Sequence, residues 1–335
     1  MMNAPNYDAI LFLSFGGPEG PDDVMPFLRN VVRGRNVPDE RLQSVAKHYM
    51  HFGGVSPINQ QNRDVISALQ IELATNDIDL PVYFGNRNWQ PMLADTMRQM
   101  QQDGVQRVLT IVTSAFSSYS GCRQYLENIR DAQQELDFPF PQVDKVRVFF
   151  NHPLFIEAVS ERIHEAFSGL DAAVNDGELI FTAHSIPMAM ADHCLYEVQL
   201  NESAKLIAER LNWQRWSLCY QSRSGPPTQP WLEPDICSYL TELADKDPSR
   251  AIVIAPLGFL SDHLEVLFDL DIEARQVCDE KGLAMARAAT VGTHPKYIEL
   301  LRILVEERLG RRESAAIGDQ PPCRDVCPAD CCLPR

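Results

Sequence analysis

Ala9-Ile-Leu-Phe-Leu-Ser-Phe15 is the part of the 335-residue chain that says most about its architecture. The run is short and almost wholly apolar, and Gly16-Gly17-Pro18 follows it, which is typical of a buried β-strand and a turn. Strands that are buried on both faces show continuous apolar runs, whereas strands with one wet face alternate apolar and polar residues. The run therefore predicts a parallel sheet that is covered on both faces.

Similar apolar runs alternate with amphipathic stretches along the rest of the chain. The further predicted strands are residues 81–85, 107–113, 145–150, 179–182, 216–220 and 251–256. The predicted helices include residues 62–75, 92–103, 202–211 and 297–309. This alternation predicts an α/β fold with two doubly wound, Rossmann-like lobes that have parallel sheets and face each other. Ligands in such folds bind beyond the carboxyl ends of the strands.

Length and composition set the expected organisation. At roughly 150 residues for each domain, the length suggests about two domains. We expect a first lobe over residues 1–155, a second over 156–310, and a linker with a Cys-rich tail over 311–335. The composition, with 45% hydrophobic and 23% charged residues, is that of an ordinary globular protein. No apolar run approaches the ~20 residues that a membrane-spanning helix needs.

Charge and the first residues bear on partners and location. The formal net charge is −16, which argues against broad nucleic-acid binding, because such binding requires a basic surface. Residues 1–8 have no basic region followed by an apolar run, so we expect no secretory signal peptide. The sequence therefore predicts a cytoplasmic protein.

Four of the nine cysteines are gathered in Cys323-Arg-Asp-Val-Cys327-Pro-Ala-Asp-Cys331-Cys332. A polar, Pro-rich tail offers no core in which thiols could be buried, so we expect them to bind something. Disulfides are disfavoured without export, and zinc sites usually show two separated Cys-x-x-Cys pairs. Adjacent Cys331 and Cys332 favour an iron–sulfur cluster with thiolates from different parts of the chain. A zinc site and an unbound or redox-active tail remain alternatives.

A histidine follows one of the predicted strands directly. Thr182-Ala-His184-Ser-Ile-Pro187 places His184 at the carboxyl end of the strand over residues 179–182, where the ligand crevice is expected. A histidine at this place can also simply cap the turn.

A line of acidic residues follows a second strand. If the chain is helical from about Asp262, then Glu265, Asp269 and Glu273 fall at i, i+4 and i+8 and form a ridge down one face. A solvated acidic face is the simpler interpretation. Apolar neighbours such as Val266 and Leu270 indicate instead that most of this helix is buried. A buried line of carboxylates near a histidine suits the passage of a divalent transition metal such as iron.

These motifs resemble those of one family. Phe181-Thr-Ala-His-Ser-Ile-Pro187 resembles a ferrochelatase signature, F-S-A-H-S-L-P, and Gly258-Phe-Leu-Ser-Asp-His-Leu-Glu-Val-Leu-Phe-Asp269 resembles the second signature of that family. Further similar segments are Gly53-Gly-Val-Ser-Pro-Ile-Asn59, Ser118-Tyr-Ser-Gly-Cys-Arg-Gln-Tyr125, Gln221-Ser-Arg-Ser-Gly225 and Pro230-Trp-Leu-Glu-Pro-Asp235. The resemblance extends over nearly the whole chain.

The resemblance implies a reaction, the insertion of Fe²⁺ into a porphyrin with release of two protons, in haem biosynthesis. It maps the catalytic and metal-binding His and Glu of the family onto His184 and Glu265. A neutral imidazole can accept a proton or bind the incoming metal, and so can the carboxylate, so their division of labour stays open. Asp269 and Glu273 would form a metal or proton channel.

The resemblance also implies a set of porphyrin contacts, which are Phe15, Arg33, Arg35, His48, Tyr49, Ser56 and Tyr125. Guanidinium groups pair bidentately with carboxylates, so Arg33 and Arg35 would suit propionates, although they can also be two solvated loop arginines. Several members of the coproporphyrin branch have Tyr where Phe15 stands. A phenyl ring cannot ligate the iron of the product, so this position offers no axial ligand here.

Some ferrochelatases carry a [2Fe–2S] cluster held by three C-terminal cysteines and one internal cysteine. The resemblance implies Cys122, Cys327, Cys331 and Cys332 as ligands, with Cys323 in reserve. Because metal insertion is not a redox step, we expect a structural or regulatory role for the cluster.

The Cys122 motif and the tail resemble the actinobacterial type, which favours coproporphyrin III as the substrate and its iron complex, coprohaem, as the product. Protoporphyrin IX is the alternative within the same chemistry. A non-catalytic porphyrin or haem carrier would need the cleft but not the acidic ridge. A cobalt or nickel chelatase for a reduced tetrapyrrole would show paired histidines and a shorter chain. Transient contact with neighbouring haem-pathway enzymes is a further expectation.

Overall fold

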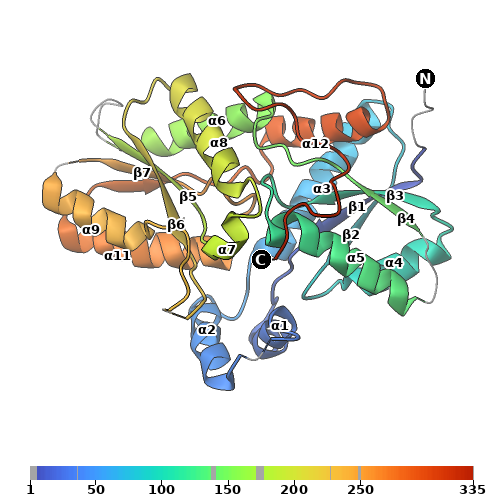
Figure 1. The fold of residues 1–335 in the computed structure, drawn as a ribbon, viewed down its shortest axis with the longest axis horizontal. Coiled ribbons are helices and arrows are strands. Elements are labelled where there is room, and N and C mark those ends of the chain that lie inside the picture. The colour runs from blue at the N-terminus through green and yellow to red at the C-terminus, as the bar shows by residue number, and fades with distance from the viewer. Residues whose placement is uncertain are drawn as a thin grey trace. The chain divides into compact units, whose positions relative to one another are not determined.

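The computed structural model of the protein describes residues 6–35, 37–136, 141–170, 177–226, 228–247 and 250–334. The chain forms two compact units that are interleaved along the sequence (Figure 1). Unit 1 comprises Met1–Thr113, Gln124–Val146 and Leu301–Glu313, and unit 2 comprises Ser114–Arg123, Arg147–Leu300 and Ser314–Arg335. The linear limits 1–155, 156–310 and 311–335 remain a prediction, whereas the units are built from alternating segments.

Unit 1 contains a four-stranded parallel sheet in the order β2-β1-β3-β4. Its strands are β1 (Ala9–Ser14), β2 (Val82–Asn86), β3 (Arg107–Val112) and β4 (Gln142–Lys145). Side chains alternate between the faces of a strand, and Ala9, Leu11 and Leu13 all join one hydrophobic cluster. That cluster includes residues of α4 (Leu93–Gln102) and α5 (Gln124–Glu135), which therefore cover one face of the sheet (Figure 1).

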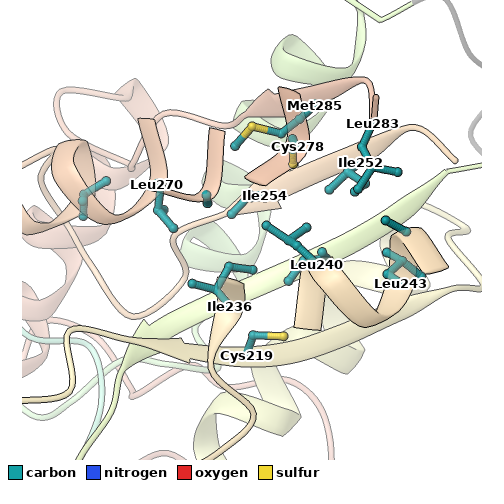
Figure 2. Packing of buried hydrophobic residues seen from close by; sticks show 14 of the residues in the cluster. Cys219, Ile236, Leu240, Leu243, Ile252, Ile254, Leu270, Cys278, Leu283 and Met285 are labelled. Atoms are coloured by element: carbon teal, nitrogen blue, oxygen red, sulfur yellow. The ribbon is translucent and has the colours of Figure 1, made fainter. Parts of the chain in front are cut away.

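Unit 2 contains a second four-stranded parallel sheet, in the order β6-β5-β7-β8. Its strands are β5 (Glu178–His184), β6 (Trp216–Gln221), β7 (Ile252–Ala255) and β8 (Met285–Arg287). Helices α6 (Pro153–Phe167) and α8 (Tyr196–Arg210) lie on one face, and α9 (Ile236–Lys246) and α11 (Arg275–Lys281) on the other (Figure 1). Figure 2 shows the core on the second face, where Leu240 of α9, Ile254 of β7 and Cys278 of α11 pack together.

The remaining elements complete the two units. They are the 3₁₀ turn η1 (Pro21–Asp23), the π-helices η2 (Tyr119–Arg123) and η4 (Leu267–Ala274), and helices α1 (Val24–Val31), α2 (Asp39–His51), α3 (Ile58–Thr75), α7 (Met188–Ala191), α10 (Leu264–Val266) and α12 (Pro295–Arg308). Among the described residues, no helix is long and apolar enough to span a bilayer.

The structure confirms the predicted α/β class with two parallel sheets, and it corrects one predicted strand. The apolar run over residues 145–150 is buried but is not a strand, because β4 ends at Lys145 where the run begins. After Val146 donates its backbone N–H to Thr110 O, the chain leaves the sheet and passes into unit 2. Burial alone accounts for the apolar composition of this stretch. Strand β8 has only three residues, and it was not predicted from the sequence.

Residues 314–320, predicted as part of a linker, form a segment that is bound to unit 2, and we call it the strap. Arg147, which is 2% exposed, donates from its guanidinium to Ala315 O at 2.9 Å. Asn151 accepts from the Ile317 backbone N–H at 3.0 Å and donates from its side chain to Gln320 O at 2.7 Å. The Cys-rich tail therefore starts from a point fixed on unit 2.

Candidate active site

The end of β5 positions His184. Ile180 belongs to the core that packs against α9 and the segment over residues 264–281, and His184 lies four residues on, so it points to the same face. The neighbouring strand β6 places Gln221 beside His184 in the register, and Cys219 of β6 belongs to the same core. Two polar side chains thus lie side by side at the carboxyl end of this sheet face.

Gly258 lets the chain after β7 cross the end of β5. Its backbone N–H donates to Thr182 O at 2.9 Å, and a Cβ on Gly258 would lie 2.7 Å from the Cα of Ala183. A separation below 3 Å from backbone cannot be accommodated without moving the chain. The glycine therefore permits the close approach that brings the acidic segment to His184.

His184 and Glu265 face each other. The Nε2 atom of His184 lies 3.8 Å from Oε2 of Glu265, and both side chains are roughly one-third to two-fifths exposed. Nδ1 of His184 lies 2.5 Å from the carbonyl oxygen of Ser185. A carbonyl can only accept, so Nδ1 carries the proton of the neutral ring and Nε2 keeps its lone pair. The site therefore presents a basic nitrogen beside a carboxylate.

His263, which was not among the predicted site residues, caps the start of α10. Its Nδ1 accepts from the Val266 backbone N–H at 3.3 Å, and its ring packs edge-on against Phe259. Burial lowers the pKa of His263, more than nearby Glu265 raises it. His263 is therefore held neutral as a structural part of the site.

The acidic residues follow a helix whose middle is π-helical. Glu265 lies in α10, and Asp269 and Glu273 lie in η4, where the helical turn is wider than in an α-helix. Burial raises the pKa of Asp269 to about 7, although a hydrogen bond from Ser222 opposes the shift. Partial burial of its carboxyl group and the charge of Asp235 also raise the pKa of Glu273. As a whole residue, Glu273 is exposed. The line of carboxylates thus runs from an exposed residue to the side chain next to His184.

An arginine that sequence reasoning missed ties this segment to the sheet. Arg287, at the end of β8, makes two hydrogen bonds to the Asp271 carboxylate, at 2.6 and 2.9 Å, and one to Asp262 at 2.6 Å. Thr290 donates to Asp262 as well. The chain on both sides of Glu265 is therefore anchored to one guanidinium, and no motif in the sequence marked it.

Unit 1 carries an aromatic cluster that contains three of the predicted porphyrin contacts. Phe27 packs against Phe15 and Tyr49, with ring centroids 6.2 and 5.7 Å apart. The guanidinium of Arg87 lies over the ring of Tyr125 at 4.5 Å and over Phe15 at 5.7 Å. Arg87 was not predicted, although it directly follows β2, and a strand end is where binding residues are expected.

The other predicted contacts of unit 1 lie in different surroundings. Ser56 is buried, at 5% exposure. Burial and the charge of Arg41 lower the pKa of His48 on α2. Arg33 and Arg35 are exposed after α1, and Arg33 donates to the Asn30 side chain at 2.8 Å.

Three of the predicted cluster cysteines lie together in unit 2. The sulfur atoms of Cys331 and Cys332 are 3.5 Å apart. A hydrogen bond with Cys122, burial and a hydrogen bond with Cys331 all raise the pKa of the Cys332 thiol. Arg123 donates to the carbonyl oxygens of Ala329 and Cys331, at 2.5 and 3.2 Å.

The two other tail cysteines are placed differently. Cys327 is exposed, and Cys323 accepts a hydrogen bond from Gln199 at 3.5 Å. Within the described ranges, no three His, Cys, Asp or Glu side chains are arranged as a site for a single ion.

Comparisons with known proteins agree on one family. A family model described as Ferrochelatase matches residues 7–309. A Rhodopirellula baltica protein named Ferrochelatase is 56% identical, over 99% of this chain and 95% of that protein. A Streptomyces coelicolor protein named Coproporphyrin III ferrochelatase is 47% identical, over 100% of this chain and 96% of its own length. The solved structure of SirB from Bacillus subtilis with Fe³⁺ has a TM-score of 0.57 at 10% identity, over 91% of this chain and 96% of that one, which indicates a shared fold.

Proposed function

Because the chain belongs to the ferrochelatase family, we propose that it inserts Fe²⁺ into a porphyrin in haem biosynthesis, most specifically into coproporphyrin III to give coprohaem. The single observation that carries the proposal is sequence similarity to ferrochelatases over nearly the full length of the chain. It includes 47% identity to a protein named for coproporphyrin III. The more similar relative is named without a macrocycle, so protoporphyrin IX is the alternative substrate.

His184 is proposed as the first proton acceptor. A porphyrin loses two N–H protons as the metal enters, and the lone pair on His184 Nε2 is free because Nδ1 donates to Ser185 O. Once protonated, the imidazolium would pair with the Glu265 carboxylate, whose oxygen lies 3.8 Å from Nε2. A positioned base of this kind contributes about 10²–10⁴-fold to the rate.

Glu265 is proposed to bind the Fe²⁺ substrate, with His184 as its neighbour during insertion. Carboxylate oxygen and imidazole nitrogen are both ligands that suit a divalent transition metal. Asp269 and Glu273 would form the route by which the metal enters or protons leave. The rise in exposure from Asp269 to Glu273 supports such a route.

The aromatic cluster of unit 1 is proposed to contact the macrocycle. Flat apolar rings are the surroundings that a porphyrin prefers, and Phe15, Tyr49 and Tyr125 supply them. Arg33 and Arg35 are proposed partners of the propionates, since both guanidinium groups are exposed. His48 and Ser56 complete the proposed set.

A [2Fe–2S] cluster is proposed at Cys122, Cys327, Cys331 and Cys332. The donor set suits it, because three of these thiols lie together. Hydrogen bonds with Cys122 and Cys331 and burial raise the pKa of the Cys332 thiol, and bound metal would stabilise its thiolate. The cluster would supply a link between the tail and η2 that forms only when iron and sulfide are present. A cytoplasmic location is proposed as well.

Anaerobic Fe²⁺ insertion tests the proposal. Freshly purified protein is offered coproporphyrin III and protoporphyrin IX in parallel, and loss of the free-porphyrin absorption bands is followed. Faster loss of the coproporphyrin bands is expected. Preference for protoporphyrin would overturn the substrate assignment, and binding of both macrocycles without insertion would favour a porphyrin carrier.

A further inference from the structure

The Gln221-Ser222 pair at the carboxyl end of β6 has no part in the function proposed so far. Gln221 is 1% exposed, and its side-chain Nε2 donates to Glu265 O at 3.4 Å and to Asp269 Oδ2 at 3.2 Å. The Ser222 hydroxyl donates to the same Oδ2 atom. The end of β6 therefore contacts the chain at two of the proposed site residues.

Ser222 is held in a conformation that serine rarely adopts. Its φ of 63° lies in the left-handed region, which costs free energy for a residue with a Cβ. Glycine would adopt the same backbone without that cost, but it has no hydroxyl group. The strain is accounted for if the contact between the hydroxyl and Asp269 is required.

The two donors act on one oxygen of the Asp269 carboxylate. With the hydroxyl of Ser222 and the amide of Gln221 both directed at Oδ2, the carboxylate cannot rotate without losing both hydrogen bonds. The other oxygen, Oδ1, takes part in neither bond. The carboxylate is thus oriented, and one oxygen is left for a ligand.

The amide oxygen of Gln221 provides a second, independent observation. Oε1 is buried, and within the described part of the chain it has no hydrogen-bond partner. A buried acceptor without a donor is costly, so such an atom needs an explanation. Water on a hydrated cation can donate to it, and oxygen atoms are ligands that such cations accept in exchange for water.

We propose that Ser222 positions Asp269 for the passage of Fe²⁺ to Glu265, and that Gln221 assists as the second donor and offers Oε1 to the hydrated ion. The inference rests on the function proposed above. Ser222 and Gln221 act through Asp269 and are positioning residues, and Asp269 meets the metal.

Substitutions at Ser222 separate the hydroxyl from the backbone. Ser222→Gly removes the hydroxyl and also removes the left-handed strain, so the fold is retained. We expect the KM for Fe²⁺ in anaerobic insertion to rise about tenfold, because a hydrogen bond to a charged group is lost. The KM for the porphyrin should stay within about twofold of the wild-type value. The urea midpoint of unfolding should stay within about a few tenths molar of the wild-type value. Ser222→Asn, which tolerates the backbone and carries a donor, should restore part of the Fe²⁺ affinity.

Asn212→Gly is the matched control, since Asn212 has a φ of 52° on unit 2 and makes none of these contacts. An Fe²⁺ KM for Ser222→Gly within twofold of the wild-type value, or an equal rise in Asn212→Gly, would overturn the inference. Titration of the porphyrin-free protein with Co²⁺, followed by visible absorption, provides a readout that does not depend on insertion. A wild-type protein that inserts no iron refutes the proposed function. In that case the inference is still tested by Co²⁺, and it fails if Ser222→Gly binds Co²⁺ as tightly as the wild type.

Discussion

At the scale of single residues, the proposed chemistry depends on which ring nitrogen of His184 holds the proton. The contact between Nδ1 and Ser185 O decides this, because a carbonyl oxygen has no proton to give. The basic nitrogen is thereby directed at Glu265 instead of into the turn. The motif could identify His184 from the sequence, but the tautomer follows only from the geometry of the strand end.

We predict that His184→Ala lowers the insertion rate by about 10²–10⁴-fold, because the proposed proton acceptor is lost. Porphyrin binding, measured by fluorescence quenching, should be largely retained. His193→Ala is the control, since His193 is exposed and its Nδ1 hydrogen-bonds to Ala189 O in its own turn. Turnover of His184→Ala near the wild-type rate would refute the assigned role.

The raised pKa of Asp269 makes a prediction about stability and pH. The ordinary value is 3.8 and the value in the folded protein is about 7, so between these values the folded state holds a proton that the unfolded state has released. Its contribution to stability is therefore complete below pH 3.8 and is lost as the pH rises to about 7. Asp269→Asn removes this dependence. Urea titrations give the free energy of unfolding of both proteins. From pH 5 to pH 8 the value for the wild type should fall relative to that for Asp269→Asn, and a constant difference would contradict the raised pKa.

At the scale of elements, the segment from Leu264 to Lys281 shows what a sequence pattern leaves out. The predicted helix exists, but its middle is π-helical, and the ridge drawn for an α-helix is correspondingly rotated. The segment is also held from outside, by the bonds from Arg287 to Asp262 and Asp271 on either side of Glu265. No local pattern in residues 262–281 could specify a partner on a later strand.

The strap offers a test of how the tail is anchored. Gly318 has a φ of 86°, and a Cβ there would lie 2.1 Å from the Glu202 carboxylate. We predict that Gly318→Ala lowers the free energy of unfolding by about 1–3 kcal/mol and speeds tryptic cleavage in residues 311–324.

Gly282→Ala is the matched control for this substitution. Gly282 has a φ of 72°, and nothing lies within 4 Å of the added Cβ. It therefore reports the backbone strain alone. The strap is bonded to Glu202, whose carboxylate accepts from the Asp319 backbone N–H. If both variants lose the same stability and resist trypsin equally, the position of the strap against Glu202 does not hold the strap.

At the scale of the whole molecule, the class of fold and most strands could be predicted from the sequence. This was possible because a strand that is buried on both faces shows a continuous apolar run. It could not predict that β4 ends before Val146, since a buried crossing segment is just as apolar as a strand. The motifs predicted His184 and Glu265 as site residues, and the structure places their side chains 3.8 Å apart. Arg87 and Arg287 were missed because single arginines carry no periodicity.

The proposed cluster links distant parts of the chain, so its loss should affect stability as a whole. We predict that Cys327→Ser yields a colourless protein without bound sulfide and with a free energy of unfolding lower by about 3–5 kcal/mol, as for the loss of a cross-link that closes a long loop. Cys323→Ser should stay brown. A brown Cys327→Ser protein would remove Cys327 from the ligand set.

The interleaving of the two units has a consequence for synthesis on the ribosome. Unit 1 includes residues 301–313, where Arg302 bonds to Glu72 and Arg308 bonds to Tyr7. At about 5–20 residues per second, more than half of the translation time passes after Glu72 has emerged and before Arg302 is made. Unit 1, whose four strands are all made by Lys145, must therefore wait without its last segment while most of the second unit is made. Nascent chains stalled before residue 301 should accordingly be cut by protease within unit 1, whereas the released protein resists.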